Sequence, residues 1–185
     1  MKKILLYLSA FVPLYFLISI KIIIDLINNN LSWNFLNTIS LVMFVILMVM
    51  GIFGAKQAIA HKRTKTTKIK IISQKNITEQ YFLGYFSLFV LFALTFELEK
   101  ISMFVVFILI IILIGIVYIK NNLFYINPFL NILGYNFYQV EYINLSTNLK
   151  DNGIFFFKGD FDISKQYCLS KLSHENFNMI KNYEE

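Results

Sequence analysis

Residues 101–119 read ISMFVVFILIIILIGIVYI, a run of 19 residues without a charged side chain. A helix of about 20 apolar residues crosses the hydrocarbon core of a bilayer. The composition of the whole chain agrees, because 57% of its 185 residues are hydrophobic and only 15% are charged, against about 25% charged residues in soluble domains. The run therefore indicates an integral membrane protein, and it argues against a soluble globular enzyme or a disordered chain.

Three more stretches, residues 4–24, 35–57 and 80–97, are apolar enough to be interpreted as spans. With residues 101–119 they predict an all-α membrane fold, with four transmembrane helices in a domain of residues 1–119. The short stretch at 80–97 is acceptable because a bilayer thins locally at modest cost. Residues 4–24 begin like a signal peptide, but their apolar run is about twice as long as a typical h-region. We therefore expect a retained helix.

The basic residues predict the orientation of these spans. The connection of residues 56–78 holds seven of the 17 basic residues and no acid between the first and last of them: Lys56, Lys62, Arg63, Lys65, Lys68, Lys70 and Lys75. Lys2 and Lys3 lie at the start of the chain, whereas residues 28–34 carry no charge. Cytoplasmic connections are enriched in Lys and Arg. We expect a bacterial inner-membrane protein with both termini and the basic connection in the cytoplasm.

The basic connection has three possible uses. The cluster could bind the anionic inner leaflet, which attracts basic residues. This use overlaps with the positive-inside rule, which by itself explains a basic cytoplasmic connection. The connection could instead bind an acidic partner protein. Contact with nucleic acid is the third use, and it is weakened because no aromatic residues for base stacking are interleaved with the lysines.

The tail of residues 120–185 differs from the spans in composition, and we expect it to form a cytoplasmic β-rich region. Residues 68–71 of the basic connection alternate polar and apolar side chains, the pattern of a half-buried strand. Ser173 and a Leu172–Phe177 staple predict a closing helix that ends near Tyr183. Strands are predicted in the tail at residues 135–145, 154–158 and 163–169.

The charged residues inside the spans are few. Lys21 and Asp25 stand four residues apart, so they share a helix face near the outer end of the first span. They could form an intramembrane pair that lines a pore, or an interfacial pair in which Lys21 reaches the headgroups. Since no carboxylate is centred in a span, the sequence argues against proton-coupled transport.

No pattern in the sequence indicates an enzyme. Cys168 is the single cysteine, and His61 and His174 lie far apart, so no metal site is predicted. Gly-rich phosphate loops and HExxH or GxSxG motifs are also absent from the sequence. We predict no catalytic residues, no cofactor and no metal.

Residues 125–141 are the most distinctive local segment, and we call them the hinge segment. Asn127 and Pro128 should end the last span, because Pro disfavours the helical conformation of the preceding residue. Gly134 permits the left-handed geometry that would release the chain into a strand. A structural role as a hinge between membrane and sheet explains the segment, and a ligand or partner site is the alternative.

An Asn-Pro-x-Leu-x-x-x-Gly-Tyr-x-x-Tyr-x-Val-Glu pattern lies in this segment. With the predicted spans, basic connection and β-rich tail, it resembles the KwaA family, the membrane component of the Kiwa anti-phage defence system. The resemblance implies a homo-oligomeric inner-membrane sensor of infection that works with a cytosolic DNA-binding effector, KwaB, and it supplies no catalytic residues. The hinge residues of interest are Tyr125, Asn127, Pro128, Gly134, Tyr135, Tyr138 and Glu141, and Leu130 and Val140 complete the pattern.

The sequence thus predicts a membrane sensor and scaffold that recruits or regulates a cytosolic effector, with nucleic acid reached only through that partner. Small residues allow helices to approach closely, and Gly51, Gly54 and Gly115 are the expected close-contact points. The alternative is a membrane protein that acts alone, such as a bacteriocin-immunity protein or an ion channel.

Overall fold

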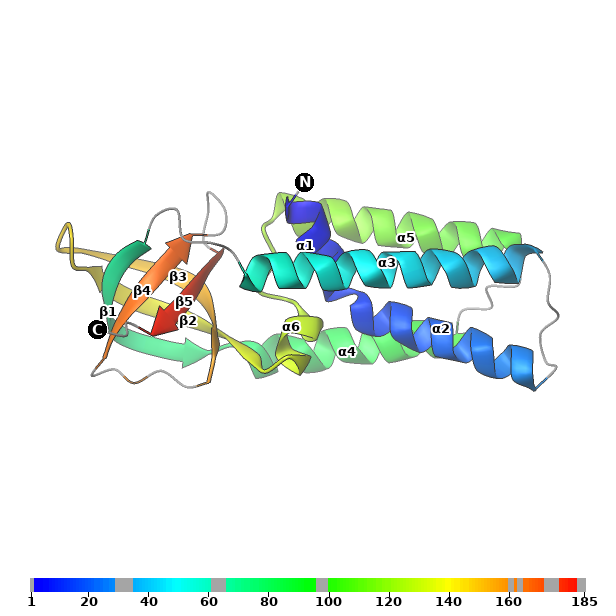
Figure 1. Ribbon diagram of the computed structural model, residues 1–185, viewed down its shortest axis with the longest axis horizontal. Coiled ribbons are helices and arrows are strands. Elements are labelled where there is room, and N and C mark those ends of the chain that lie inside the picture. Colours follow the sequence, from blue (N-terminus) through cyan, green and yellow to red (C-terminus); the bar gives the residue numbers. More distant parts are fainter. Residues whose placement is uncertain are drawn as a thin grey trace.

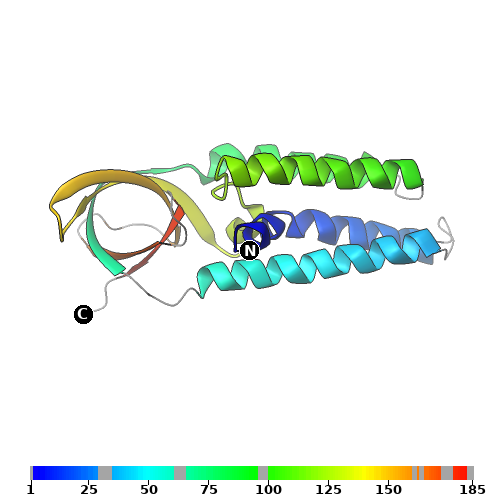
Figure 2. The same ribbon diagram turned by 90° about the horizontal axis from the view of Figure 1, so that it is seen from above.

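The computed structural model describes residues 2–28, 35–60, 66–95, 100–159, 162, 165–171 and 177–182. It consists of a helical bundle and a β-barrel that lie end to end along the long axis (Figure 1). Seen from above, α3 lies on one side of α1 and α2, and α4 and α5 lie on the other side (Figure 2). The helices are α1 (Lys2–Ala10), α2 (Val12–Ile27), α3 (Phe35–Ile59), α4 (Thr78–Thr95), α5 (Ile101–Lys120) and the short α6 (Pro128–Ile132).

The prediction of an all-α fold with four transmembrane helices is wrong. In the described part of the chain, only α3 and α5 are long and apolar enough to cross a membrane, and a third span is reached only if α1 and α2 together count as one. α4 falls short because its first turn is polar, with Thr78, Glu79 and Gln80. Its remaining 15 residues are about 22 Å long, less than the roughly 30 Å of the hydrocarbon core.

The first predicted span is not a straight helix. α1 and α2 are bent by 51° at a break between them. Pro13 lies in the first turn of α2, where its ring excludes a continuous helix by clashing with the carbonyl of Ser9, four residues earlier. The break therefore has a local cause in the sequence.

Glycine allows α1 to pack closely against α3 and α5. A Cβ at Gly51 would lie 2.5 Å from Cγ2 of Val12, and a Cβ at Gly54 would overlap the carbonyl oxygen of Leu5. A Cβ at Gly115 would lie 2.9 Å from the Tyr7 ring. The close contacts at these three glycines are thus made within the chain, to α1 and, at Gly51, also to the first residue of α2.

The strands of the described chain form a closed barrel in the order β1-β2-β3-β5-β4. Neighbouring strands are antiparallel except β3 and β5, which are parallel. This order and these directions are those of the five-stranded OB barrel, here with α4, α5 and α6 inserted between the first two strands. The strands are β1 (Thr66–Asn76), β2 (Tyr135–Asn144), β3 (Leu149–Lys158), β4 (Gln166–Lys171) and β5 (Phe177–Asn182).

The predicted alternation of residues 68–71 is confirmed. Ile69 and Ile71 are buried inside the barrel, whereas Lys68 and Lys70 are exposed. The strands predicted at 135–145 and 154–158 are confirmed as β2 and β3. The barrel interior is filled by aliphatic and aromatic side chains: Ile69, Ile71, Tyr138, Val140, Tyr142, Phe155, Phe157, Tyr167 and Leu169.

The predicted closing helix is wrong, because residues 177–182 form β5. β5 pairs with β3 on one side and β4 on the other, so it satisfies two strand edges that would otherwise stay open. This long-range pairing outweighs the local helix signal. Ser173, the predicted N-cap, lies outside the described residues.

We expect Gly54→Ala to lower the free energy of unfolding by about 1–3 kcal/mol, because the new methyl group overlaps the backbone of α1. Gly84→Ala is the matched control: a Cβ there meets nothing within 4 Å, so it should stabilise α4 by about 0.5–1 kcal/mol. Thermal unfolding of the detergent-solubilised chain measures both changes. Equal effects of the two substitutions would show that α1 does not pack closely at Gly54.

Candidate functional site

The bundle meets the barrel at the hinge segment, and Asn127 is the polar centre of this junction. Its side chain is fully buried. Its Oδ1 accepts a hydrogen bond from the backbone N–H of Leu130 at 3.1 Å, which caps α6. Its Nδ2 donates to Ser9 Oγ at 2.7 Å. Since Ser9 lies at the end of α1, Asn127 connects the hinge segment directly to the bend in the first two helices.

Two tyrosines hold α5 in place, one against the hinge segment and one against α1. The hydroxyl of Tyr118 donates to the carbonyl of Ile126 at 3.0 Å, and that of Tyr7 donates to the carbonyl of Ile111. The two rings pack with centroids 5.3 Å apart. α5 then ends in a Schellman turn, in which Asn122 has a φ of +52° and the N–H of Leu123 donates to the carbonyl of Tyr118.

The remainder of the hinge segment leads the chain into the barrel. Gly134 has a φ of +84°, the left-handed geometry that the sequence predicts there. β2 begins at the next residue, Tyr135, whose ring packs edge-on against Phe156. Tyr125 packs edge-on against Tyr81 of α4, and burial raises the pKa of the Tyr125 phenol.

The structure separates the residues that the sequence grouped as one hinge. Tyr125, Asn127, Pro128, Gly134 and Tyr135 lie at the junction. Tyr138 lies inside the barrel, where its hydroxyl donates to the carbonyl of Gly159, and Glu141 is exposed on the outer face of β2.

A second connection joins α4 to the barrel. The N–H of Phe137 donates to Thr78 Oγ1 at 2.7 Å, and the N–H of Ile77 donates to the carbonyl of Phe137 at 2.9 Å. Phe137 and its register partner Phe156 are buried on the outer face of the barrel and belong to the core of the bundle. The first turn of α4 and this aromatic pair therefore hold the barrel against the helices.

Sequence reasoning missed Ser9, Thr78, Phe137 and Phe156. One signal could have revealed Phe137: Gln139 and Glu141 follow it at the outward positions of β2, where an aromatic residue breaks a polar face. The hydrogen bonds of Ser9 and Thr78 join residues 118 and 59 positions apart, so no local pattern indicates them.

The basic connection lies along one exposed strand. Lys68, Lys70 and Lys75 are exposed on the outer face of β1, and the register places Lys70 opposite Ile143 and Lys75 opposite Gln139. Lys56 is exposed in the last turn of α3. Lys62, Arg63 and Lys65 lie outside the described residues.

Lys21 and Asp25 lie in the second half of α2, a helix that extends away from the barrel (Figure 1). Both side chains are half-buried. Lys21 Nζ donates to the carbonyl of Leu94 at 3.4 Å, in the last turn of α4. A cation at a helix C-terminus is favourable, so this contact gives Lys21 a structural role between α2 and α4.

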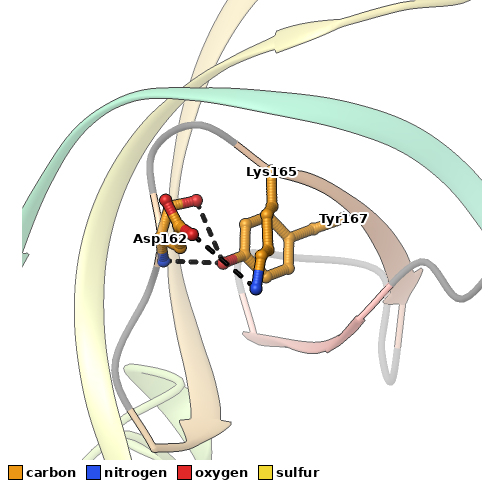
Figure 3. A network of polar contacts seen from close by, with 3 residues as sticks. All are labelled: Asp162, Lys165 and Tyr167. Carbon is orange, nitrogen blue, oxygen red and sulfur yellow. Dashed lines mark hydrogen bonds and ion pairs between the residues drawn. The ribbon is translucent and has the colours of Figure 1, made fainter.

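Polar contacts within the barrel are structural as well. Tyr167 fills the interior, and its hydroxyl donates to the carbonyl of Asp162 and accepts from the N–H of the same residue (Figure 3). Lys165 lies 3.7 Å from the Asp162 carboxylate, an exposed pair of little energetic weight. Burial, with a hydrogen bond to Asp151, raises the pKa of Tyr142 to about 12. In the described residues, no group of His, Cys, Asp and Glu could hold a metal ion.

The comparisons identify the family. The family model described as anti-phage protein KwaA matches residues 2–182. The chain belongs to the KwaA family. Its match covers the bundle, the junction and the barrel together, and it confirms the resemblance given by the hinge segment. No curated protein and no solved structure matches the chain.

Membership of the KwaA family makes the chain an anti-phage defence protein. The junction is the candidate functional site because the described helices are joined to the barrel either there or through the basic connection. It combines buried hydrogen bonds, edge-on contacts between aromatic rings and one left-handed glycine.

We expect Asn127→Ala to lower the free energy of unfolding by about 1–3 kcal/mol, because Ser9 and the N–H of Leu130 lose their buried partner. Ser9→Ala in the same chain should cost less than in the native chain, with a coupling of about 0.5–3 kcal/mol. Asn152→Ala, an exposed residue of β3, is the control and should change stability by less than about 0.5 kcal/mol. Additive losses in the Asn127 and Ser9 cycle would show that the two side chains are not coupled.

Proposed function

We propose that this chain is a membrane-embedded sensor of infection that transmits a change in helix packing to its barrel and recruits a cytosolic effector there. The observation that carries the proposal is the shared core of bundle and barrel, in which Phe137 and Phe156 of the barrel pack among the helices. A part that is packed in this way responds when its neighbours shift.

The surface of the bundle supports a location in the bilayer. α3 and α5 expose large apolar side chains along their length, with Ile46 53%, Val49 58% and Leu113 62% exposed. A contiguous apolar surface of this kind marks a membrane or protein contact. The same faces provide surface for association between copies, and we expect a homo-oligomer.

The lysines support an orientation with the barrel in the cytoplasm. Lys3 is exposed at the start of α1, and Lys56 and Lys120 are exposed at the ends of α3 and α5. These helix ends are the ones that face the barrel, which contains β1 and its lysines (Figure 1). By the positive-inside rule, this end of the bundle faces the cytoplasm. The N-terminus of α1 and the last strand both lie at this end (Figure 1), so both termini are cytoplasmic in this proposal. α4, which is too short to span the bilayer by itself, carries the chain away from the barrel while packed against α2, and α5 brings it back.

The barrel favours a protein partner over nucleic acid. OB barrels bind oligonucleotides on the face of β2 and β3, where aromatic side chains stack on bases. Here the aromatic pair of that face, Phe137 and Phe156, is covered by the bundle. We infer that the exposed lysines of β1 bind an acidic surface of a soluble effector of the KwaB type, through which the chain reaches nucleic acid indirectly.

Charge reversal tests recruitment. We expect Lys68→Glu with Lys70→Glu to reduce co-purification of the effector by about tenfold or more, since like charges would then meet at the interface. Lys158→Glu with Lys165→Glu changes the charge equally on other exposed parts of the barrel region and should leave recruitment intact. The measurement is affinity purification from detergent extracts, with plaque formation as the readout in cells. Unchanged co-purification, or an equal loss in the control pair, would contradict the proposed docking strand.

Cysteine labelling tests the orientation. In a Cys168→Ser chain, Lys70→Cys places a thiol on the barrel and Asn28→Cys places one at the far end of α2. A membrane-impermeant maleimide should label Asn28→Cys in intact spheroplasts, and Lys70→Cys only after the membrane is permeabilised. The reverse pattern would overturn the proposed orientation.

A further inference from the structure

An apolar cavity of about 270 Å³ lies in the bundle between α4 and α5. α4 packs on α2, and α5 packs on α1, on the same side of the bundle (Figure 2). The bend between α1 and α2 forms the floor of the cavity with Ala10 and Phe11, and Ile126 and Pro128 of the hinge segment form one end. All of its lining side chains are aliphatic or aromatic.

The cavity opens sideways, where lipid surrounds the bundle in the proposed orientation. Leu113 and Val117 line it and are themselves 62% and 53% exposed, so they lie at its mouth. Its volume is slightly below the roughly 300 Å³ at which small-molecule pockets begin. It therefore suits a slender apolar group, such as part of one acyl chain, better than a bulky ligand.

Two cations lie at the barrel end of this cavity. Lys120 follows Val117 by three residues on α5, so the two side chains share a helix face. Lys3 Nζ donates to Asn122 Oδ1 at 3.0 Å and lies 6.0 Å from the centre of the Phe124 ring, which packs edge-on against Tyr118 in the cavity wall.

No acid competes with these cations along the segments that form the cavity's floor, its end and the α5 wall. Residues 1–24 and 101–140 contain no Asp or Glu. On α4 the acidic residue is Glu79, in the first turn, which lines a separate groove with Asn131 and Ile132. The arrangement thus combines an apolar slot with two cations at its barrel end, on segments that contain no acidic residue.

We propose that the cavity binds one acyl chain of an anionic glycerophospholipid, whose phosphate lies against Lys3 and Lys120. This inference rests on the proposed membrane location. The lipid chain would contact both the bend of the first two helices and the hinge segment. Its presence or loss would therefore change the packing that the junction transmits, which gives the sensor a specific ligand within the bilayer.

Native mass spectrometry of the full-length chain in detergent, with added phosphatidylglycerol or phosphatidylcholine, tests this site. We expect one tightly bound phosphatidylglycerol, with an affinity at least about tenfold above that for phosphatidylcholine. Lys3→Gln with Lys120→Gln should remove this preference, and Lys100→Gln at the other end of α5 should not. Equal binding of both lipids to the unmodified chain would overturn the role of the cations.

A second variant tests the slot itself. Val117→Trp should fill the mouth and weaken binding of both lipids by about tenfold, whereas Val106→Trp, an exposed position on α5 outside the cavity, should leave it unchanged. Lipid binding that survives Val117→Trp would overturn the proposal. If Val117→Trp changed the number of subunits in the assembly and left lipid binding unchanged, the proposal would also be overturned, because a second copy of the chain and not a lipid would then cover the cavity.

Failure of this inference can be told apart from failure of the proposed function. A chain that alkaline carbonate extracts from membranes would overturn both. A chain that stays in the membrane and recruits its effector, but binds no phosphatidylglycerol in the cavity, would overturn the lipid site alone.

Discussion

The hydrogen bond between Asn127 and Ser9 lies where water does not reach, and the arrangement of the molecule depends on it. A buried amide must find partners, because an unsatisfied polar group costs about 1–3 kcal/mol. Asn127 meets this demand by bonding to the end of α1 and to the first turn of α6. The bent helix pair, the hinge segment and the start of β2 are thereby fixed relative to one another. The shared core around Phe137 and Phe156 then extends this fixed geometry to the barrel.

Closure of the barrel answers a second constraint. An open strand edge is a template for unwanted pairing, and a small sheet has little core of its own. β5 removes both exposed edges by pairing with β3 and β4. The side chains that fill the interior are large, and Phe155 and Tyr167 are almost fully buried. A domain of this size gains further stability by resting its outer aromatic pair on the helices.

Features with a local cause could be predicted from the sequence. The alternation around Ile69 and Ile71 and the left-handed Gly134 each follow from a few neighbouring residues. The prediction that Asn127 and Pro128 end the last span is wrong, because α5 ends at Lys120 and these two residues instead cap and begin α6. The four-span fold and the closing helix were wrong for a different reason. Apolar composition alone does not show that Pro13 bends the first helix or that α4 begins with a polar turn, and β5 forms only because distant strands pair with it. The partners of Ser9 and Thr78 are distant in the sequence and were not predictable.

The order of the strands has a consequence for synthesis on the ribosome. β1 leaves the ribosome before α4 and α5, yet its ladder partners in β2 and β4 come after both helices. β1 therefore stays unpaired until α4 and α5 are in place and the last strands have been synthesised. Non-local pairing of this kind is slow. The barrel can therefore close only after the preceding helices are in position. A binding surface that requires the closed barrel is then present only on a fully assembled chain.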